Sequence, residues 1–186
     1  LLGSQLHPDN AGLPFPLVFT GPKSAEEYFR RIDEFIGQTL GIEAQRLYKI
    51  IIDSPDQVAR EVKVGLQLVR DLRTARHDAY NFNWLPKIAH EFQMPFVPTH
   101  PNPLKLHKDQ PNHLLAADLR RALSGIVAGN VKTDGIREIE KHGSFEIHGE
   151  ASIMGPMDDL LASFVAQHRM KLAGKKYNPC YTLVSR

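Results

Sequence analysis

The chain has 186 residues and a mass of 21.0 kDa, with 42% apolar and 24% charged residues. This composition is ordinary for a globular domain and excludes a mainly disordered or fibrous chain. The sequence contains neither a secretory signal nor an apolar run near the roughly 20 residues of a membrane span. A single cysteine, Cys180, excludes an internal disulfide and a multi-thiolate zinc site, and favours a reducing, cytoplasmic compartment. The net charge of +2 points to no class of partner by itself.

Two short apolar runs in the first part of the chain predict buried strands, at residues 15–20 and 47–52. Each is followed by a helical pattern, so we expect parallel pairing with a right-handed crossover. Two parallel strands do not make a stable sheet. The chain also begins Leu1-Leu2-Gly3, without an initiator methionine. We therefore expect a piece of a longer protein, whose preceding residues complete the sheet.

Helix boundaries in this part are predicted from capping residues. Ser24 and Ser54 each stand three residues before a Glu or Gln, which is the spacing of a capping box. Gly41 provides a left-handed cap for the first helix, and Pro55 suits the first position of the second. The expected apolar faces are Tyr28, Ile32, Phe35 and Ile36 on the first helix, and Val58, Val62, Leu66, Val69 and Leu72 on the second.

A second domain is predicted at residues 77–186, after a core at 1–76. Six of its prolines lie in an extended connection at residues 86–111. We expect a helix-rich α+β domain, with His168 on the inner face of its last helix and Pro156 in that helix's first turn. The expected strands are residues 79–84, 145–147 and 177–184, and the expected helices are residues 112–128, 134–142 and 152–172.

Ligands of open parallel sheets bind beyond the carboxyl ends of the strands. Thr20, Gly21, Lys23 and Asp53 follow the two predicted strands, and a helix N-terminus that can meet an anion comes next in each case. These four residues are our candidate nucleotide-binding site. The alternative is that they are ordinary turn and cap residues, which every doubly wound sheet has.

Five cations of the second domain are candidates for binding a phosphate: Arg120, Arg121, Lys132, Arg169 and Lys171. Adjacent helical residues point about 100° apart, so we expect one of Arg120 and Arg121 beside the apolar face and the other in solvent. The same geometry separates Arg169 from Lys171. The alternative is a solvated surface. The nine histidines lack the spacing of a metal site, and no metal is predicted.

Longer runs of the sequence resemble a known family. The runs PLVFTGP (16–22), YF (28–29), IDEFI (32–36) and YKIIID (48–53) are similar to the C-terminal end of the Rossmann-like domain of the Lonely Guy family, long mislabelled as lysine decarboxylases. The later runs resemble its bacterial nucleotide 5′-monophosphate nucleosidase branch. They are DAY (78–80), FNW (82–84), QMPF (93–96), AADLRRA (116–122), SGIVAGNVK (124–132) and FVAQHRMKL (164–172).

This resemblance implies an enzyme that hydrolyses the N-glycosidic bond of nucleoside monophosphates, giving free base and ribose 5-phosphate without a cofactor. The family's glycine-rich catalytic loop, Pro-Gly-Gly-x-Gly-Thr-x-x-Glu-Glu, is absent from these residues. Leu1-Leu2-Gly3 resembles the end of the helix that follows it. We therefore expect the catalytic residues upstream of Leu1, and a homo-oligomer that binds no nucleic acid or membrane. The alternative is a regulatory module that senses guanosine tetra- or pentaphosphate and has no catalysis of its own.

Overall fold

The computed structural model describes residues 1–77, 104–172 and 176–184, and the chain divides into two compact units, residues 1–89 and 90–186. The strand predicted at residues 79–84 and most of the proline-rich connection lie outside the described residues. The fold is mixed α/β, as predicted. Among the described helices, none combines the length and apolarity needed to span a bilayer.

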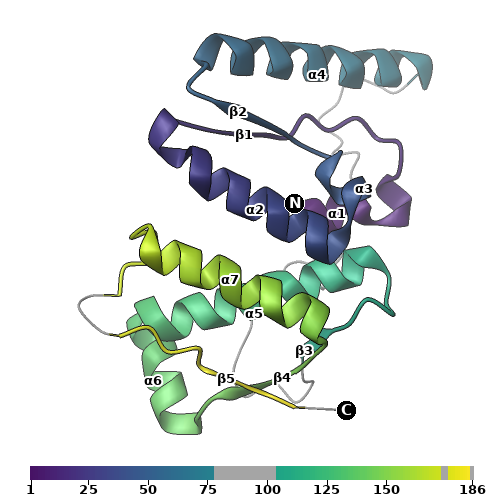
Figure 1. The fold of residues 1–186 in the computed structure, drawn as a ribbon. Coiled ribbons are helices and arrows are strands. Elements are labelled where there is room, and N and C mark those ends of the chain that lie inside the picture. Colours follow the sequence, from purple (N-terminus) through teal and green to yellow (C-terminus); the bar gives the residue numbers. More distant parts are fainter. Residues whose placement is uncertain (78–103, 173–175, 185–186) are drawn as a thin grey trace. The chain divides into compact units, whose positions relative to one another are not determined.

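The first unit pairs two parallel strands between two long helices (Figure 1). Strands β1 and β2 run in the register Val18↔Lys49, which confirms the predicted parallel pairing. Helices α2 and α4 lie on opposite faces of this pair (Figure 1). The elements are α1 (Leu2–Leu6), η1 (Pro8–Asn10), β1 (Val18–Gly21), η2 (Lys23–Ala25), α2 (Glu26–Leu40), α3 (Ile42–Gln45), β2 (Lys49–Ile52) and α4 (Pro55–Ala75).

Both strands begin later than predicted. Pairing starts where the Lys49 amide donates to the Leu17 carbonyl at 3.0 Å. The ring of the preceding Pro16 lies against α4 at Gly65, where an added Cβ would come within 2.3 Å of the Pro16 Cβ. The absence of a side chain at Gly65 therefore lets the helix and the chain approach closely.

The predicted capping boxes are wrong. Ser24 lies inside the short 3-10 helix η2, where the Ala25 amide donates to the Pro22 carbonyl, and α2 begins only at Glu26 with no side-chain cap. Ser54 does occupy the N-cap position of α4, and Pro55 its first position, but the Ser54 side chain makes no capping bond. Gly41 does end α2 with a positive φ of 83°. Its ψ of 175° makes this a region open essentially to glycine alone.

Alternate residues of β1 face the two helices. The Phe19 ring lies 6.1 Å from the Phe29 ring of α2 and 4.8 Å from the Tyr48 ring, measured between centroids. The Tyr48 hydroxyl donates to the Asp33 carboxylate of α2 at 2.6 Å. This apolar layer, with the buried residues Phe35, Ile36 and Leu40, covers only the α2 face of the strands.

The second unit is a three-stranded parallel sheet in the order β3-β4-β5, with helical crossovers. Strand β3, which the sequence analysis missed, is short and alternates buried and exposed residues. Helices α5 and α7 bury the apolar side chains of Leu115, Leu119, Ile126, Met157 and Leu161, and α5 contacts β3. The elements are β3 (Leu104–Leu106), α5 (Asn112–Val131), α6 (Thr133–His142), β4 (Phe145–Gly149), α7 (Ala151–Ala166) and β5 (Tyr181–Leu183).

Two predictions about α7 are wrong. The helix ends at Ala166, and His168 is exposed with a φ of 55° instead of lying in the core. The His168 amide donates to the Val165 carbonyl and the Arg169 amide to the Phe164 carbonyl, which is the Schellman pattern of a helix end. Glycine usually signals this end, and a histidine conceals it. Pro156 lies inside the helix, beyond its first turn.

A buried amide holds the C-terminal strand segment on α5. The Asn130 side chain donates to the Asn178 carbonyl at 2.6 Å and accepts from the Asn178 amide at 2.8 Å. It also donates to the Cys180 sulfur at 3.1 Å. Burial raises the pKa of the Cys180 thiol, which keeps it protonated and unreactive at neutral pH.

Candidate functional site

Three of the four predicted nucleotide-binding residues meet at the carboxyl ends of β1 and β2. The Asp53 amide donates to the Gly21 carbonyl at 2.9 Å and so ties the two strand ends together. Asp53 has a φ of 55°, a left-handed conformation that aspartate tolerates better than most residues. The Asp53 side chain and Thr20 are exposed, so a carboxylate and a hydroxyl are both accessible at this edge.

Gly21 makes a close turn possible at the same edge. A Cβ at this position would lie 3.0 Å from the Ala25 Cβ and 3.1 Å from a ring carbon of Phe29. These separations are tighter than most real contacts, so any larger residue would push η2 away from the strand. The glycine therefore serves the packing of the turn.

Lys23 is not a free cation. Its ammonium lies 2.7 Å from the Glu26 carboxylate, and the lysine side chain is 72% exposed. The first turn of α2 also contains Glu26 and Glu27, and the first turn of α4 contains Asp56. These acids complement the positive ends of both helices. An anion at either helix end would have to compete with them.

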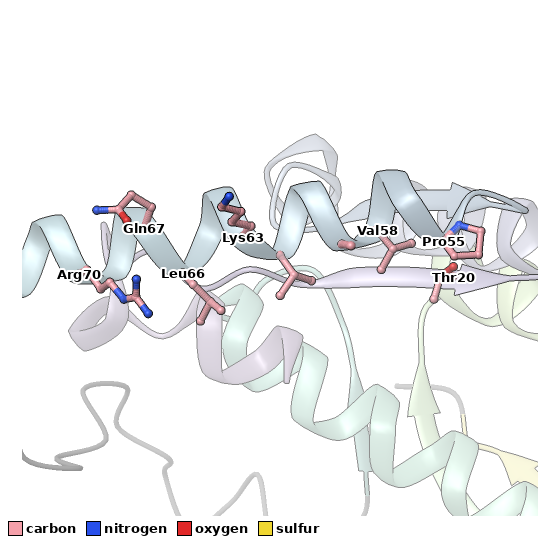
Figure 2. A pocket seen from close by; sticks show the side chains of 9 residues that line it. Thr20, Pro55, Val58, Lys63, Leu66, Gln67 and Arg70 are labelled. Carbon is pink, nitrogen blue, oxygen red and sulfur yellow. The ribbon is translucent and has the colours of Figure 1, made fainter.

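A groove of about 680 Å³ runs from this edge along α4 (Figure 2). Thr20 and Pro55 stand at one end, and the side chains of Val58 and Leu66 project from α4 above the space beside β1. Lys63, Gln67 and Arg70 form a polar rim along the helix. Val62 and Leu66, which were predicted on the apolar face of this helix, are both exposed.

The two adjacent arginines of α5 divide as predicted. Arg120 is exposed, whereas the Arg121 side chain is only 15% exposed. Arg121 Nη1 donates to the Asp118 carboxylate at 3.2 Å, while its Nε and Nη2 are buried and have no hydrogen-bond partner in the described parts of the chain. Burial raises the pKa of the Asp118 carboxyl, which Arg121 partly opposes. The sequence analysis missed Asp118, although its spacing of three residues from Arg121 is a recognised helical pair.

The other three predicted cations are exposed and lie beyond the ends of α5 and α7. Lys132 is exposed and follows α5, about 16 Å along the helix axis from Arg121 at 1.5 Å per residue. Arg169 and Lys171 are exposed and lie beyond the end of α7, so the helical geometry used to separate them does not apply. The described parts of the chain contain no cluster of three metal-ligating side chains.

What this arrangement can do chemically is bind and orient. The strand-end site presents one exposed carboxylate, that of Asp53, and one exposed hydroxyl, that of Thr20. Two guanidinium nitrogens of Arg121 are buried without an acceptor among the described residues, and a buried donor without an acceptor costs about 1–3 kcal/mol.

The family model and the relatives reported below each match most of the chain. Residues 66–184 match the family model of the C-terminal region of pyrimidine/purine nucleotide monophosphate nucleosidases. Proteins of Escherichia coli strains K12 and O157:H7, each named pyrimidine/purine nucleotide 5′-monophosphate nucleosidase, are 55% identical to the chain over 185 residues. The match covers 98% of this chain and 41% of each relative. The chain thus spans less than half the length of the curated relatives it matches.

Proposed function

Because the chain belongs to the pyrimidine/purine nucleotide monophosphate nucleosidase family, we propose that it is the C-terminal portion of an enzyme that hydrolyses nucleoside 5′-monophosphates to base and ribose 5-phosphate. The observation that carries this proposal is the 55% identity over nearly the whole chain to enzymes of that name. The enzyme would be a cytoplasmic homo-oligomer of the Rossmann-like Lonely Guy type. The catalytic loop would come from residues outside this chain.

The geometry at the strand ends favours a substrate-binding role for this portion. Cleavage of an N-glycosidic bond passes through a state that resembles an oxocarbenium ion. A carboxylate can stabilise that state or direct water to it. Thr20 and Asp53 are accessible where a parallel sheet binds ligands. In this proposal they contact the sugar or base, and Lys23 contacts phosphate only by leaving Glu26.

The test is base release from several nucleoside monophosphates by two proteins. One is the 186-residue chain alone, and the other is a chimera in which the chain replaces the matched region of the E. coli K12 relative. We expect activity from the chimera only. Activity of the isolated chain would show that the catalytic residues are misplaced, and an inactive but folded chimera would contradict the proposed function.

A second function, nucleotide sensing by the second unit, is favoured by Arg121. Its Nε and Nη2, which are buried and have no acceptor within the described residues, form a fork that matches two oxygens of a phosphate. We propose that an effector phosphate, with guanosine tetra- or pentaphosphate as the candidate, accepts from them. The exposed cations Arg120, Lys132, Arg169 and Lys171 are secondary candidates for the same role.

Adjacent substitutions test this sensing role. We expect Arg121→Ala to weaken binding of guanosine tetraphosphate to the chimera at least tenfold by calorimetry, which corresponds to about 1.4 kcal/mol. Arg120→Ala is the matched control and should change affinity less than threefold. Thermal unfolding of each variant reports whether the fold survives. If Arg121→Lys, which keeps the charge without the fork, binds as well as the original protein, the role of Arg121 is wrong.

A further inference from the structure

We propose that Asp118 and Gln110 close the outer edge of β3, so that no strand of another molecule can pair with it. The proposal concerns assembly and needs neither a nucleotide nor a catalytic loop, so it is independent of the proposed function. A sheet edge with unpaired amides and carbonyls is a template for pairing with another chain, and natural proteins protect such edges. In the described sheet of the second unit, β3 is an outer strand of the order β3-β4-β5.

The backbone of Lys105 is turned away from β4. The Glu150 amide donates to the Leu106 carbonyl at 3.1 Å, so Leu106 bonds to the β4 side. In a parallel ladder alternate residues bond to the same neighbour, so Leu104 also faces β4, and Lys105 between them faces the other way. Within the described residues, β4 is the one strand paired with β3. Lys105 therefore carries the backbone donor and acceptor that a further strand would use.

Side chains already occupy both of these backbone groups. Gln110, in the turn after β3, donates through Nε2 to the Lys105 carbonyl at 2.7 Å. The Lys105 amide donates to the Asp118 carboxylate of α5. A carboxamide and a carboxylate thus take the places that the N–H and C=O groups of a neighbouring strand would fill. A strand arriving from another molecule would have to displace both.

The Asp118 carboxylate is held in this position. Arg121 Nη1 donates to it at 3.2 Å, and the Asp118 and Arg121 side chains are only 20% and 15% exposed. Burial raises the pKa of the Asp118 carboxyl, because a charge is unfavourable there. The neighbouring residues of α5, Ala117 and Leu119, are buried and apolar. An apolar residue at position 118 would avoid the cost of burying a charge, but it would leave the Lys105 amide open to another strand.

The strand itself has two further features of a protected edge. It has three residues, and its middle side chain, Lys105, is exposed, whereas Leu104 and Leu106 are buried. Short edge strands and charged side chains, lysine above all, disfavour pairing between molecules. Two copies of β3 that paired about Lys105 would also place like charges opposite each other. The side chains of Asp118 and Gln110 close the backbone, and the lysine opposes a second copy of the same strand.

Two double variants of the 186-residue chain test the proposal. Gln110→Ala/Asp118→Ala removes both closing groups. Gln67→Ala/Asp71→Ala is the matched control, because it removes a hydrogen-bonded pair of the same residue types from the exposed surface of α4. Sedimentation velocity over a range of concentrations measures association. We expect the first variant to associate further at a concentration at least tenfold lower than the original chain, and the control to differ less than twofold. Any oligomer of the original chain is common to all variants and cancels.

Amide hydrogen exchange reports on the edge directly. We expect the Lys105 amide to exchange at least tenfold faster in Asp118→Ala than in the original chain. Asp118→Asn keeps an oxygen that can accept from this amide, and the exchange rate should stay within threefold. The proposal is wrong if Lys105 exchanges equally fast in the original chain and in Asp118→Ala. It is also wrong if the first double variant, folded by circular dichroism, associates no more than the control. If that variant does not fold, Gln110→Ala decides, and unchanged association of this single variant overturns the proposal.

Discussion

Both units pack helices on parallel strands, but they differ in how fully those helices are buried. In the second unit, which has three strands, α5 and α7 bury Leu115, Ile126, Met157 and Leu161 almost fully. In the first unit α4 has no buried residue, although its 21 residues show the same apolar spacing. Helix α2 lies on the other face of the same two strands and does bury Phe35, Ile36 and Leu40, so the difference belongs to the α4 face of the pair. An apolar stripe therefore predicts which face of a helix can be buried, and not that the described residues bury it.

The largest expected effect on stability comes from comparing the same substitution, leucine to alanine, on α7 and on α4. Leu161→Ala removes a fully buried side chain from α7 and should lower the free energy of unfolding by about 2–5 kcal/mol. Leu66→Ala on α4 of the isolated chain should change it by less than about 0.5 kcal/mol, because that side chain is half exposed. Urea unfolding of both variants measures the difference. Similar losses would mean that α4 is packed in solution.

The next effect concerns the anchor that completes the second sheet. Asn130→Asp keeps the size of the side chain but removes the donors to the Asn178 carbonyl and the Cys180 sulfur, and adds a charge in a buried place. We expect a loss of about 2–3 kcal/mol and faster exchange of the β5 amides. Asn178→Ala, which keeps the backbone bonds to Asn130, is the control. If the two cost the same, the anchor is the Asn178 side chain.

The sequence predicted the well-buried parts because apolar spacing and burial coincide there. The helix predicted at residues 112–128, which is α5, and the parallel pairing of β1 and β2 are of this kind. The prediction failed where local geometry decided the outcome. The 3-10 turn at Ser24 replaced a side-chain cap, and a histidine at position 168 took the conformation that glycine usually signals. Strand β3 was missed because its three residues follow a proline-rich stretch and give too short an alternation to detect.

For the candidate site, the sequence could predict where the residues lie but not which contacts their side chains make. The topology of parallel strands brings Gly21 and Asp53 together, and the sequence could show that. It could not show that Lys23 is paired with Glu26, since either partner had other neighbours of opposite charge to choose from. Nor could it show that two nitrogens of Arg121 lack an acceptor, because burial of a helix flank depends on what packs over it.

A smaller effect on the free energy of unfolding is expected in the first unit, where Tyr48 connects the start of β2 to α2. Tyr48→Phe removes the bond to Asp33 and should cost about 1 kcal/mol at neutral pH. Burial, with Asp33 nearby, raises the pKa of Tyr48 above its usual value near 10. The unfolded chain therefore loses its tyrosine protons first, and the stability due to Tyr48 is present below about pH 10 and is lost above it.

The check for Tyr48 is the difference in unfolding free energy between the original chain and Tyr48→Phe, followed from pH 8 to 11. We expect this difference to shrink above about pH 10. Burial also raises the pKa of Tyr177 and Tyr181, but both are present in each protein and cancel in the difference. A difference independent of pH would mean that Tyr48 titrates normally and that its bond to Asp33 does not persist.

The smallest expected effect on stability belongs to Lys23, and that makes it the most informative for binding. Its ion pair with Glu26 is exposed and should contribute no more than about 0.5 kcal/mol. Lys23→Gln should therefore leave unfolding of the isolated chain unchanged. A phosphate contact in the chimera would be charge-assisted, and its loss should raise the dissociation constant for a nucleoside monophosphate about tenfold or more. Glu26→Gln frees the lysine and should act in the opposite direction. If both variants bind like the original, Lys23 contributes only a surface ion pair, and nucleotide contacts of the first unit fall to Thr20 and Asp53.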